Sequence, residues 1–564
     1  MRCSKRDSRK CERVETWKKQ PQLKRPVADR TAADAEAFNE KAKYTVGLDS
    51  SRAHAQTSSS VNHHAADRLA RIQAETLHRF GVASSSSSDV ERRAGISLKS
   101  IPDWQQSALA TQSARLAQMT LHNADIKASL HKRDVEVSCA HMFSHAIPYE
   151  VKPVVNQKNS GRCWLFATCN VIRHQAAKAL DLDEFELSQS YLSFWDKLEK
   201  SNYFLENMIE LADEPLDQRV VGFLKTAPTN DGGQWDMVAN LLEKYGVVPK
   251  SVFPESYNSS YSSQINWLVT LKLREYTLEL RQIKQDVERK LGNLVHRSMS
   301  AQEISYAVRQ AQRARKDEQM EEVYRLLVIS LGTPPQPDDE FTYNYRNKDG
   351  KFVTIRSTPK RFLAEYTGTF DHKSRCSLIH DPRHEPDQLI TVQRLGNVWE
   401  GTPISYVNTT VDVMRTAVVS SIKAGHPVFF GCDVGQFSDK TSGIMDPALF
   451  GYEEAFNVTL GLTKAQRIEL GESSMTHAMV ITAVHIDDRT GKVERYRVEN
   501  SWGEAGVGNG KGFMVMSDKW FEEFNYQVVV DKKFMPKHLW SLFTRGVDDK
   551  TVRLPPYDPL GALA

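Results

Sequence analysis

The chain has 564 residues, of which 40% are hydrophobic and 26% are charged, a composition typical of a soluble globular protein with a large core. Its formal net charge of +3 does not favour nucleic acid, a membrane surface or another polyanion as an obligatory partner. The chain contains no run of about 18 apolar residues and no secretory signal, so we expect a cytoplasmic protein without a membrane-spanning helix. Seven cysteines without a CxxC pair argue against a disulfide framework and against structural zinc.

Residues 1–95 differ in composition from the rest. They carry 19 Lys and Arg against 12 Asp and Glu, a net charge of +7, and include a serine run at 84–88. Sustained apolar periodicity is absent, which predicts a disordered extension. A mitochondrial presequence is an alternative that would create a mitochondrial pool, although four acidic residues before Thr31 do not fit that pattern.

The remaining chain divides into four predicted regions. Residues 96–260 begin with an apolar pattern of helical spacing, through Trp104, Leu109, Leu116 and Met119. Residues 261–402 are a mainly helical insertion, whose two long amphipathic segments meet at a candidate N-cap, Ser300. Residues 403–550 are rich in short β-type runs, and residues 551–564 form a proline-containing arm. The fold class is therefore predicted to be α+β, with a helical half and an antiparallel sheet or barrel. The strands are expected at 426–434, 477–486, 495–501, 512–516 and 526–531.

Cys163 is the candidate nucleophile. A polar loop from Asn156 to Arg162 leads into an apolar helical pattern, which puts this cysteine at the first turn of a helix. Unpaired backbone N–H groups and the helix dipole favour a thiolate there. Gln157 lies six residues upstream, and its amide could donate to the oxyanion together with the backbone N–H of Cys163.

A nucleophilic thiol needs a base that can later protonate the leaving amine, and imidazole suits both tasks. Among 17 histidines, His477 is the best candidate because it opens a strongly apolar strand. Asn500 follows at another predicted strand end and could fix the imidazole tautomer. Trp502 could shield that hydrogen bond from water, and we also count it among the substrate-binding residues.

In this order, the residues resemble the papain-like cysteine peptidases, and in particular the bleomycin hydrolase family of aminopeptidases. The matching motifs are Asn156-Gln-Lys-Asn-Ser-Gly-Arg-Cys-Trp-Leu-Phe-Ala, Glu186-Leu-Ser-Gln-Ser-Tyr, Asp231-Gly-Gly-Gln, Thr476-His-Ala-Met and Tyr496-Arg-Val-Glu-Asn-Ser-Trp-Gly. His477 lies 314 residues after Cys163, whereas simple papain-type enzymes separate the two by about 130–150 residues. The large insertion accounts for the difference.

The resemblance implies further properties. It implies a homohexamer with its active sites facing an internal channel, and a C-terminal arm in the active-site cleft with Ala564 as the anchor for the substrate α-amine. Gly232 and Gly233 resemble the glycine pair that lines the substrate cleft. The substrates would be peptides and small amides or thiolactones with a free α-amine, such as bleomycin and homocysteine thiolactone. No cofactor and no metal site are predicted.

Two other interpretations remain open. One is a nucleic-acid-binding protein on a peptidase-like scaffold, working through the basic extension or through a basic channel associated with the family, although an excess of three basic residues in 271–330 is too small to argue for it. The other is an endopeptidase whose C-terminal arm does not occlude the cleft.

Overall fold

The computed structural model describes residues 95–292, 299–368, 370–507 and 511–562. The predicted disordered extension lies almost wholly outside these residues, as does Ala564. The chain divides into two compact units, residues 1–102 and 103–564, and every candidate site residue belongs to the second. None of the described helices combines the length and apolar character needed to cross a bilayer.

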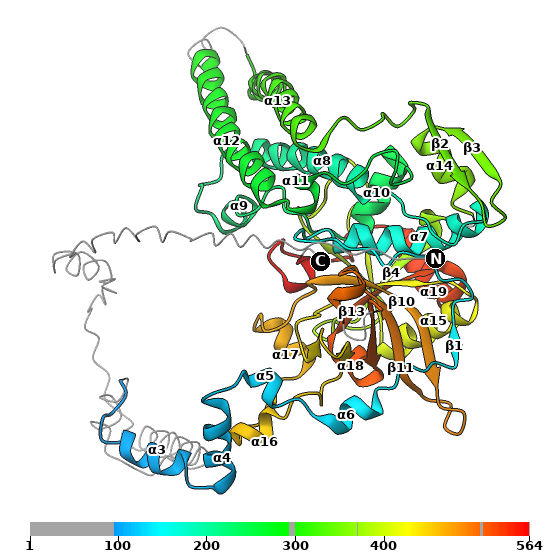
Figure 1. Ribbon diagram of the computed structural model, residues 1–564. Helices are drawn as coiled ribbons and strands as arrows, with labels where there is room; N and C mark the ends of the chain where they lie inside the picture. The colour runs from blue at the N-terminus through cyan, green and yellow to red at the C-terminus, as the bar shows by residue number, and fades with distance from the viewer. Residues whose placement is uncertain (1–94, 293–298, 369, 508–510, 563–564) are drawn as a thin grey trace, which may run out of the picture. The chain divides into compact units, whose positions relative to one another are not determined.

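A 12-stranded sheet runs through the second unit (Figure 1). Its strands are β1 (His145–Ala146), β4 (Arg375–Ile379), β5 (Gln388–Val392), β6 (Tyr406–Asn408), β7 (Val428–Cys432), β8 (Ser438–Asp439), β9 (Ile444–Met445), β10 (His477–Ile486), β11 (Val493–Glu499), β12 (Phe513–Ser517), β13 (Asn525–Asp531) and β14 (Val552–Leu554). The order is β14-β5-β6-β4-β13-β7-β10-β11-β12-β9-β8, with β1 pairing to β10. The five predicted strands are β7 and β10 to β13, and they form its central antiparallel block. The α+β prediction is confirmed.

Helices cover the sheet and build the other half of the molecule. The longer ones are α3 (Ile101–Ala108), α4 (Gln112–Leu121), α7 (Cys163–Leu180), α8 (Gln189–Glu210), α10 (Trp235–Tyr245), α12 (Ser263–Gly292), α13 (Ala301–Leu331), α14 (Pro359–Tyr366), α15 (Val411–Lys423) and α19 (Lys537–Arg545). The shorter ones are α5 (Ile126–Ser129), α6 (Arg133–Ser138), α9 (Arg219–Leu224), α11 (Tyr257–Ser260), α16 (Tyr452–Phe456), α17 (Lys464–Glu469) and α18 (Asp518–Phe524).

The predicted helical insertion contains both expected helices. Figure 1 shows α12 and α13 side by side, and both pack against α8. Ser300 is the N-cap of α13 and forms a capping box with Glu303, as its position predicted. The same stretch also contains a separate hairpin of β2 (Phe341–Arg346) and β3 (Phe352–Ser357), and it supplies β4 and β5 to the main sheet. These four short strands lacked the strong apolar run by which β10 was predicted.

The helical pattern expected near residue 96 is interrupted. Thr111 is the N-cap of α4, where its side chain accepts from the Ala114 amide, and an N-cap residue cannot continue the preceding helix. Three of the four apolar side chains of this pattern are exposed, with Trp104 at 56% and Met119 at 71%, and Leu109 is half-buried. Helical spacing therefore predicted the local structure correctly but did not identify core residues.

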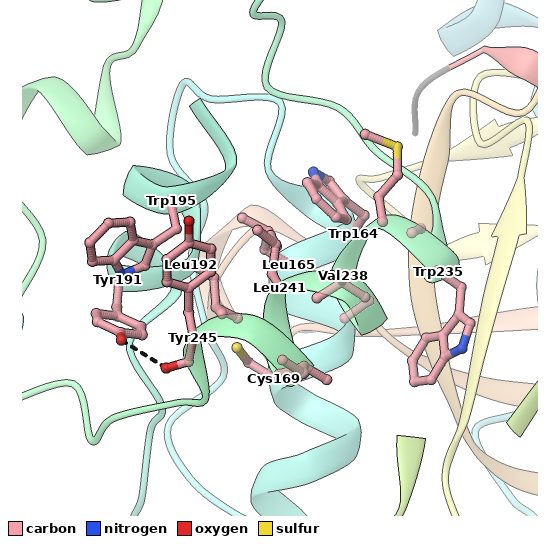
Figure 2. Close-up of a cluster of buried hydrophobic side chains, with 14 of the residues drawn as sticks. Trp164, Leu165, Cys169, Tyr191, Leu192, Trp195, Trp235, Val238, Leu241 and Tyr245 are labelled. Atoms are coloured by element: carbon pink, nitrogen blue, oxygen red, sulfur yellow. Dashed lines mark hydrogen bonds between the residues drawn. The ribbon is translucent and has the colours of Figure 1, made fainter. Parts of the chain in front are cut away.

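The core of the helical half is built from α7, α8 and α10. Figure 2 shows Trp164 and Leu165 of α7, Trp195 of α8 and Leu241 of α10 as members of one buried cluster. The hydroxyl of Tyr191 donates to the Tyr245 backbone oxygen at 2.9 Å, which satisfies the polar end of a fully buried ring. Strand β10 is buried on both faces, which explains its continuous apolar sequence.

Two charged residues join the helical half to the sheet in the interior. Arg173 of α7 donates to Glu499 of β11 at 2.5 Å, with side-chain exposures of 0% and 3%. The other oxygen of Glu499 lies 3.4 Å from Nε2 of His174. Although burial acts in the opposite direction, the Arg173 guanidinium and the His174 hydrogen bond lower the pKa of Glu499 from 4.5 to about 2. The ion pair's contribution to stability is thus present above about pH 4.5 and is lost as the pH falls toward 2.

Replacing Arg173 with Met leaves Glu499 buried without its charged partner. We expect the free energy of unfolding, measured by urea denaturation at pH 7, to fall by about 3–5 kcal/mol. Adding Glu499→Gln removes the uncompensated charge, so the double variant should lose less than the sum of the two single variants. Additive losses would contradict direct coupling. Arg361→Met is the control, because its pair with Glu365 is exposed and its loss should leave the free energy of unfolding nearly unchanged.

Candidate active site

Cys163 is the first residue of α7, as the sequence predicted, and is 2% exposed. The last two residues of the loop before it are fixed by hydrogen bonds to two acidic side chains. The Gly161 amide donates to Asp231 Oδ2 at 3.1 Å, and the Arg162 guanidinium makes two hydrogen bonds to Glu255. Cys163 therefore starts the helix from a rigid loop.

The same loop pairs with the chain that follows β11. The backbone amide of Gln157 donates to the Ser501 backbone oxygen at 2.8 Å, and the backbone amide of Gly503 donates to the Val155 oxygen at 2.9 Å. The Ser501 hydroxyl donates to Gln157 Oε1 at 2.5 Å. This contact fixes the orientation of the side-chain amide of Gln157, whose Nε2 donates to the Ser160 backbone oxygen at 2.6 Å. An amide nitrogen carries two hydrogens, and this bond uses one of them.

His477 and Asn500 form a direct hydrogen bond inside the protein. His477 Nε2 lies 3.0 Å from Asn500 Oδ1, and Asn500 is fully buried. The Ser501 backbone amide also donates to Asn500 Oδ1 at 2.7 Å, which identifies this atom as the oxygen. Nε2 of His477 therefore carries a hydrogen, and Nδ1 is the nitrogen left to accept a proton.

The Trp502 ring covers this pair. Its centroid lies 5.2 Å from that of the His477 ring, at an interplanar angle of 33°. An apolar ring at this distance excludes water from one side of the imidazole. Together with the surrounding core, it places the hydrogen bond to Asn500 in an environment of low polarity, where such bonds are stronger.

The Cys163 thiol lies beside the first residues of β10. The backbone amide of Ala478, the residue after His477, lies close enough to this thiol to lower its pKa. Burial raises the pKa of Cys163 to about 12, although the backbone amides of Ala478 and Trp164 act to lower it. Burial also lowers the pKa of His477 to about 4, against the opposing effect of Asn500. The expectation of a thiolate stabilised by the helix terminus is therefore not met, because desolvation outweighs it, and both groups are neutral near pH 7.

The predicted glycine pair lies against the helix that carries Cys163. A Cβ on Gly233 would approach the Trp164 ring to 2.6 Å, so only glycine fits there. The Trp164 indole N–H donates to the Asp231 backbone oxygen at 2.6 Å. Lys200 donates to the Gly232 oxygen at 2.5 Å and lies over the Trp164 ring. These contacts hold the glycine backbone beside the Cys163 loop.

Other residues that organise the site were not predicted. Asp231 is buried and accepts hydrogen bonds from Lys197 at 2.6 Å and from Asn266 at 3.0 Å. These partners hold the pKa of its carboxyl well below the ordinary range. Arg173 and Glu499 were also missed. A charged residue within the apolar pattern of α7 and an acid directly before Asn500 were signals that could have indicated a buried pair.

The C-terminal arm reaches the glycine pair. Gln234, the residue after Gly233, donates from Nε2 to the Ala562 backbone oxygen at 2.5 Å. Ala564 lies outside the described residues. Among the residues that are described, no three His, Cys, Asp or Glu side chains are grouped so that they could hold a metal ion.

A model of the Peptidase C1-like family matches residues 95–561. The chain belongs to this family. Aminopeptidase C of Listeria monocytogenes is 42% identical over 450 residues, which cover 79% of this chain and 94% of that protein. Human bleomycin hydrolase is 42% identical over 441 residues, covering 77% and 91%. Cysteine proteinase 1, mitochondrial, of Saccharomyces cerevisiae is 41% identical over 474 residues, covering 83% and 93%.

A solved structure shares the fold of this Peptidase C1-like chain. The crystal structure of PepW from Lactobacillus rhamnosis matches with a TM-score of 0.75 and 40% identity, and covers 84% of this chain and 100% of that one. The prediction of a papain-like cysteine aminopeptidase is confirmed at the level of the family.

Gly233→Ala should destabilise the protein because its new methyl group would have to displace the Trp164 ring. We expect a loss of about 1–3 kcal/mol in the free energy of unfolding, together with reduced turnover of an aminoacyl-coumarin. Gly222→Ala is a matched control, since a Cβ there meets nothing within 4 Å and the site is helical. It should leave stability unchanged or raise it slightly. Equal stability of both variants would contradict the close packing of Gly233 on Trp164.

Proposed function

We propose that this cysteine aminopeptidase uses Cys163 as its nucleophile, His477 as general base and acid, Asn500 to orient His477, and Gln157 to stabilise the oxyanion. The observation that carries the proposal is the hydrogen bond between His477 Nε2 and Asn500 Oδ1, next to the Ala478 amide that contacts the Cys163 thiol. Two segments far apart in the sequence, at Cys163 and at His477 to Asn500, would supply groups with complementary chemistry.

The reaction begins from a neutral thiol and a neutral imidazole. As sulfur attacks the scissile carbonyl carbon, the thiol proton moves to Nδ1 of His477, and the carbonyl oxygen becomes an oxyanion. The second amide hydrogen of Gln157 and the backbone N–H of Cys163 donate to that oxygen. The C–N bond then breaks, His477 returns its proton to the leaving amine, and a thioester on Cys163 remains.

Water completes the cycle. His477 removes a proton from the water as its oxygen attacks the thioester carbonyl. The C–S bond then breaks to release a carboxylic acid, and His477 returns its proton to the sulfur to restore the thiol. Asn500 keeps Nε2 of His477 protonated through both steps, so that Nδ1 performs each proton transfer. Trp502 keeps water away from that hydrogen bond and borders the cleft on the side of the leaving group.

The substrates we propose are peptides with a free α-amine. Gly232 and Gly233 would pair with an extended substrate backbone, and the arm would end the cleft beyond them. The contact between Gln234 and Ala562 supports this placement. The carboxylate of Ala564 would then pair with the substrate α-ammonium. An arm at this position leaves room for only one residue on the acyl side of the scissile bond.

We also propose that the enzyme accepts small amides and thiolactones that carry a free α-amine. One relative is named bleomycin hydrolase, and we propose that this chain also hydrolyses bleomycin and homocysteine thiolactone, in a broad detoxifying role. We place the activity in the cytoplasm, with a mitochondrial pool if residues 1–95 act as a presequence. Fractionation of cells that express the full chain tests the location.

The experiment that tests the mechanism compares wild type with Cys163→Ala on an aminoacyl-coumarin with a free amine. Because no other group replaces the thiol, turnover should fall by at least about 10³-fold, while the thermal unfolding temperature stays within a few degrees of wild type. Cys169→Ala is the control, because Cys169 is fully buried on the same helix and should retain turnover. Residual activity of Cys163→Ala near wild type would refute the mechanism.

We further propose that the chain forms a homohexamer through its helical insertion. In the single chain, α12 exposes large apolar side chains at Trp267 (61%), Leu271 (45%) and Leu278 (58%). Exposed apolar groups repeated along one helix are typical of a surface that is covered in an assembly.

Light scattering of the purified full chain should give six times the mass of one chain. Trp267→Ser with Leu271→Ser should reduce that mass, because both changes remove apolar surface from the interface. Lys272→Ser on the same helix is the control and should keep the hexamer. A wild-type monomer at micromolar concentration would contradict the proposed assembly.

A further inference from the structure

The C-terminal arm is attached to both halves of the protein before it reaches the glycine pair. Its strand β14 pairs in parallel with β5. Beyond it, the Arg219 guanidinium of α9 lies 3.8 Å from the Tyr557 ring centroid. The next residue, Asp558, is bound from the opposite half by Arg383, which follows β4. Two adjacent arm residues therefore contact the helical half and the sheet half respectively.

Arg383 joins two carboxylates through paired hydrogen bonds. It donates to Asp558 from Nη1 at 3.0 Å and from Nη2 at 2.9 Å, and to Asp381 from Nε and Nη2, both at 2.9 Å. Asp381 is completely buried, and the Asp558 side chain is 9% exposed. The two carboxylates raise the pKa of Arg383 further above its ordinary value. Bidentate pairing of this kind fixes direction as well as distance.

Asp558 in turn organises the last described turn of the arm. Its carboxylate accepts from the Leu560 amide at 2.9 Å, and its backbone oxygen accepts from the Gly561 amide at 2.8 Å. Leu560 is 1% exposed, so this turn is packed into the protein. The turn ends at Ala562, whose oxygen accepts from Gln234 beside the glycine pair. A shift of Asp558 would therefore move Ala562 within the cleft.

The contacts beyond Asp558 are weaker than the arginine pair. The Tyr406 hydroxyl lies 3.5 Å from the Leu560 oxygen, at the limit of a hydrogen bond. The Met475 amide reaches the Pro559 oxygen at 3.2 Å. These two contacts and the shorter bond from Gln234 to Ala562 are all between neutral groups, whereas hydrogen bonds between charged partners are roughly twice as strong.

We propose that Arg383 is a positioning residue that sets the specificity of the enzyme: by holding Asp558 it fixes how far the arm enters the cleft, and so enforces the requirement for a free α-amine. This inference rests on the proposed function, in which the arm ends the cleft. It assigns the discrimination between free and blocked amino termini to a residue that touches neither the substrate nor Cys163.

The test is the ratio of kcat/KM for an N-acetyl-aminoacyl-coumarin to that for the same substrate with a free amine. Arg383→Gln and Asp558→Asn should each raise this ratio by about tenfold or more, the effect expected from losing one charge-assisted pair. Arg383→Lys should restore part of the discrimination, because it keeps the charge without the bidentate geometry. A ratio measured on one sample does not change when only the fraction of folded protein falls.

Arg415→Gln is the matched control. Arg415 also pairs with acids, Asp412, Asp518 and Glu522, and its side chain is 20% exposed against 18% for Arg383. Arg415 belongs to α15, and its acidic partners among the described residues lie on α15 and α18. The ratio for Arg415→Gln should therefore equal that of wild type. Thermal unfolding of all variants identifies any that fail to fold, and Asp558→Asn then tests the pair from its other side.

A variant lacking residues 558–564 distinguishes a failure of the role of Arg383 from a failure of the role of the arm. If this deletion raises the ratio while Arg383→Gln and Asp558→Asn do not, the arm gates the cleft without the arginine, and the inference is overturned. If the deletion also leaves the ratio unchanged, the arm does not gate the cleft, and the proposed requirement for a free amine fails with it. Activity that survives Cys163→Ala would refute the mechanism itself.

Discussion

Arg173 and Glu499 form a buried ion pair that joins the helix carrying Cys163 to the strand that leads to Asn500. A site divided between two halves works only if their relative position is fixed, and small displacements of reacting groups lower rates strongly. The pair fixes one end of the junction, and the hydrogen bonds between Gln157 and Ser501 fix the other. Removing either partner of a buried pair lowers the free energy of unfolding strongly, because the other partner stays buried as an uncompensated charge. The geometry of the site therefore depends on the junction formed by the Arg173–Glu499 pair and the Gln157–Ser501 hydrogen bonds.

Desolvation explains the electrostatic character of the site. Cys163 and His477 are both buried, and burial disfavours the charged form of each. In the proposed mechanism the resting thiol and imidazole are therefore both neutral, and charge separates when the thiol proton moves to His477. Dipoles that are already oriented, from the Ala478 amide and from Asn500, then act on the charges without reorganisation. The requirement for fixed dipoles in a dry site is the reason why the junction must be rigid.

Sequence patterns predicted the local features of this arrangement well. The loop-to-helix transition at Cys163, the strand opening at His477 and the cap at Ser300 each follow from a few neighbouring residues, and the structure places them as expected. Interactions between distant segments could not be predicted in this way. The partner of Arg173 lies 326 residues away, and nothing local shows that Arg383 binds Asp558. The direction of the Cys163 pKa shift was also wrong, because a helix terminus is visible in a sequence whereas the depth of burial is not.

The most direct measurement is to trap the intermediate that the account requires. Enzyme turning over an aminoacyl ester with a free amine is quenched in acid within the first turnovers, and its peptides are analysed by mass spectrometry. The account predicts the mass of one aminoacyl group on the peptide that contains Cys163, and a labelled fraction that grows in His477→Ala only at a greatly reduced rate. Turnover with no label on Cys163, or with label on Cys169 or Cys432 instead, would contradict it.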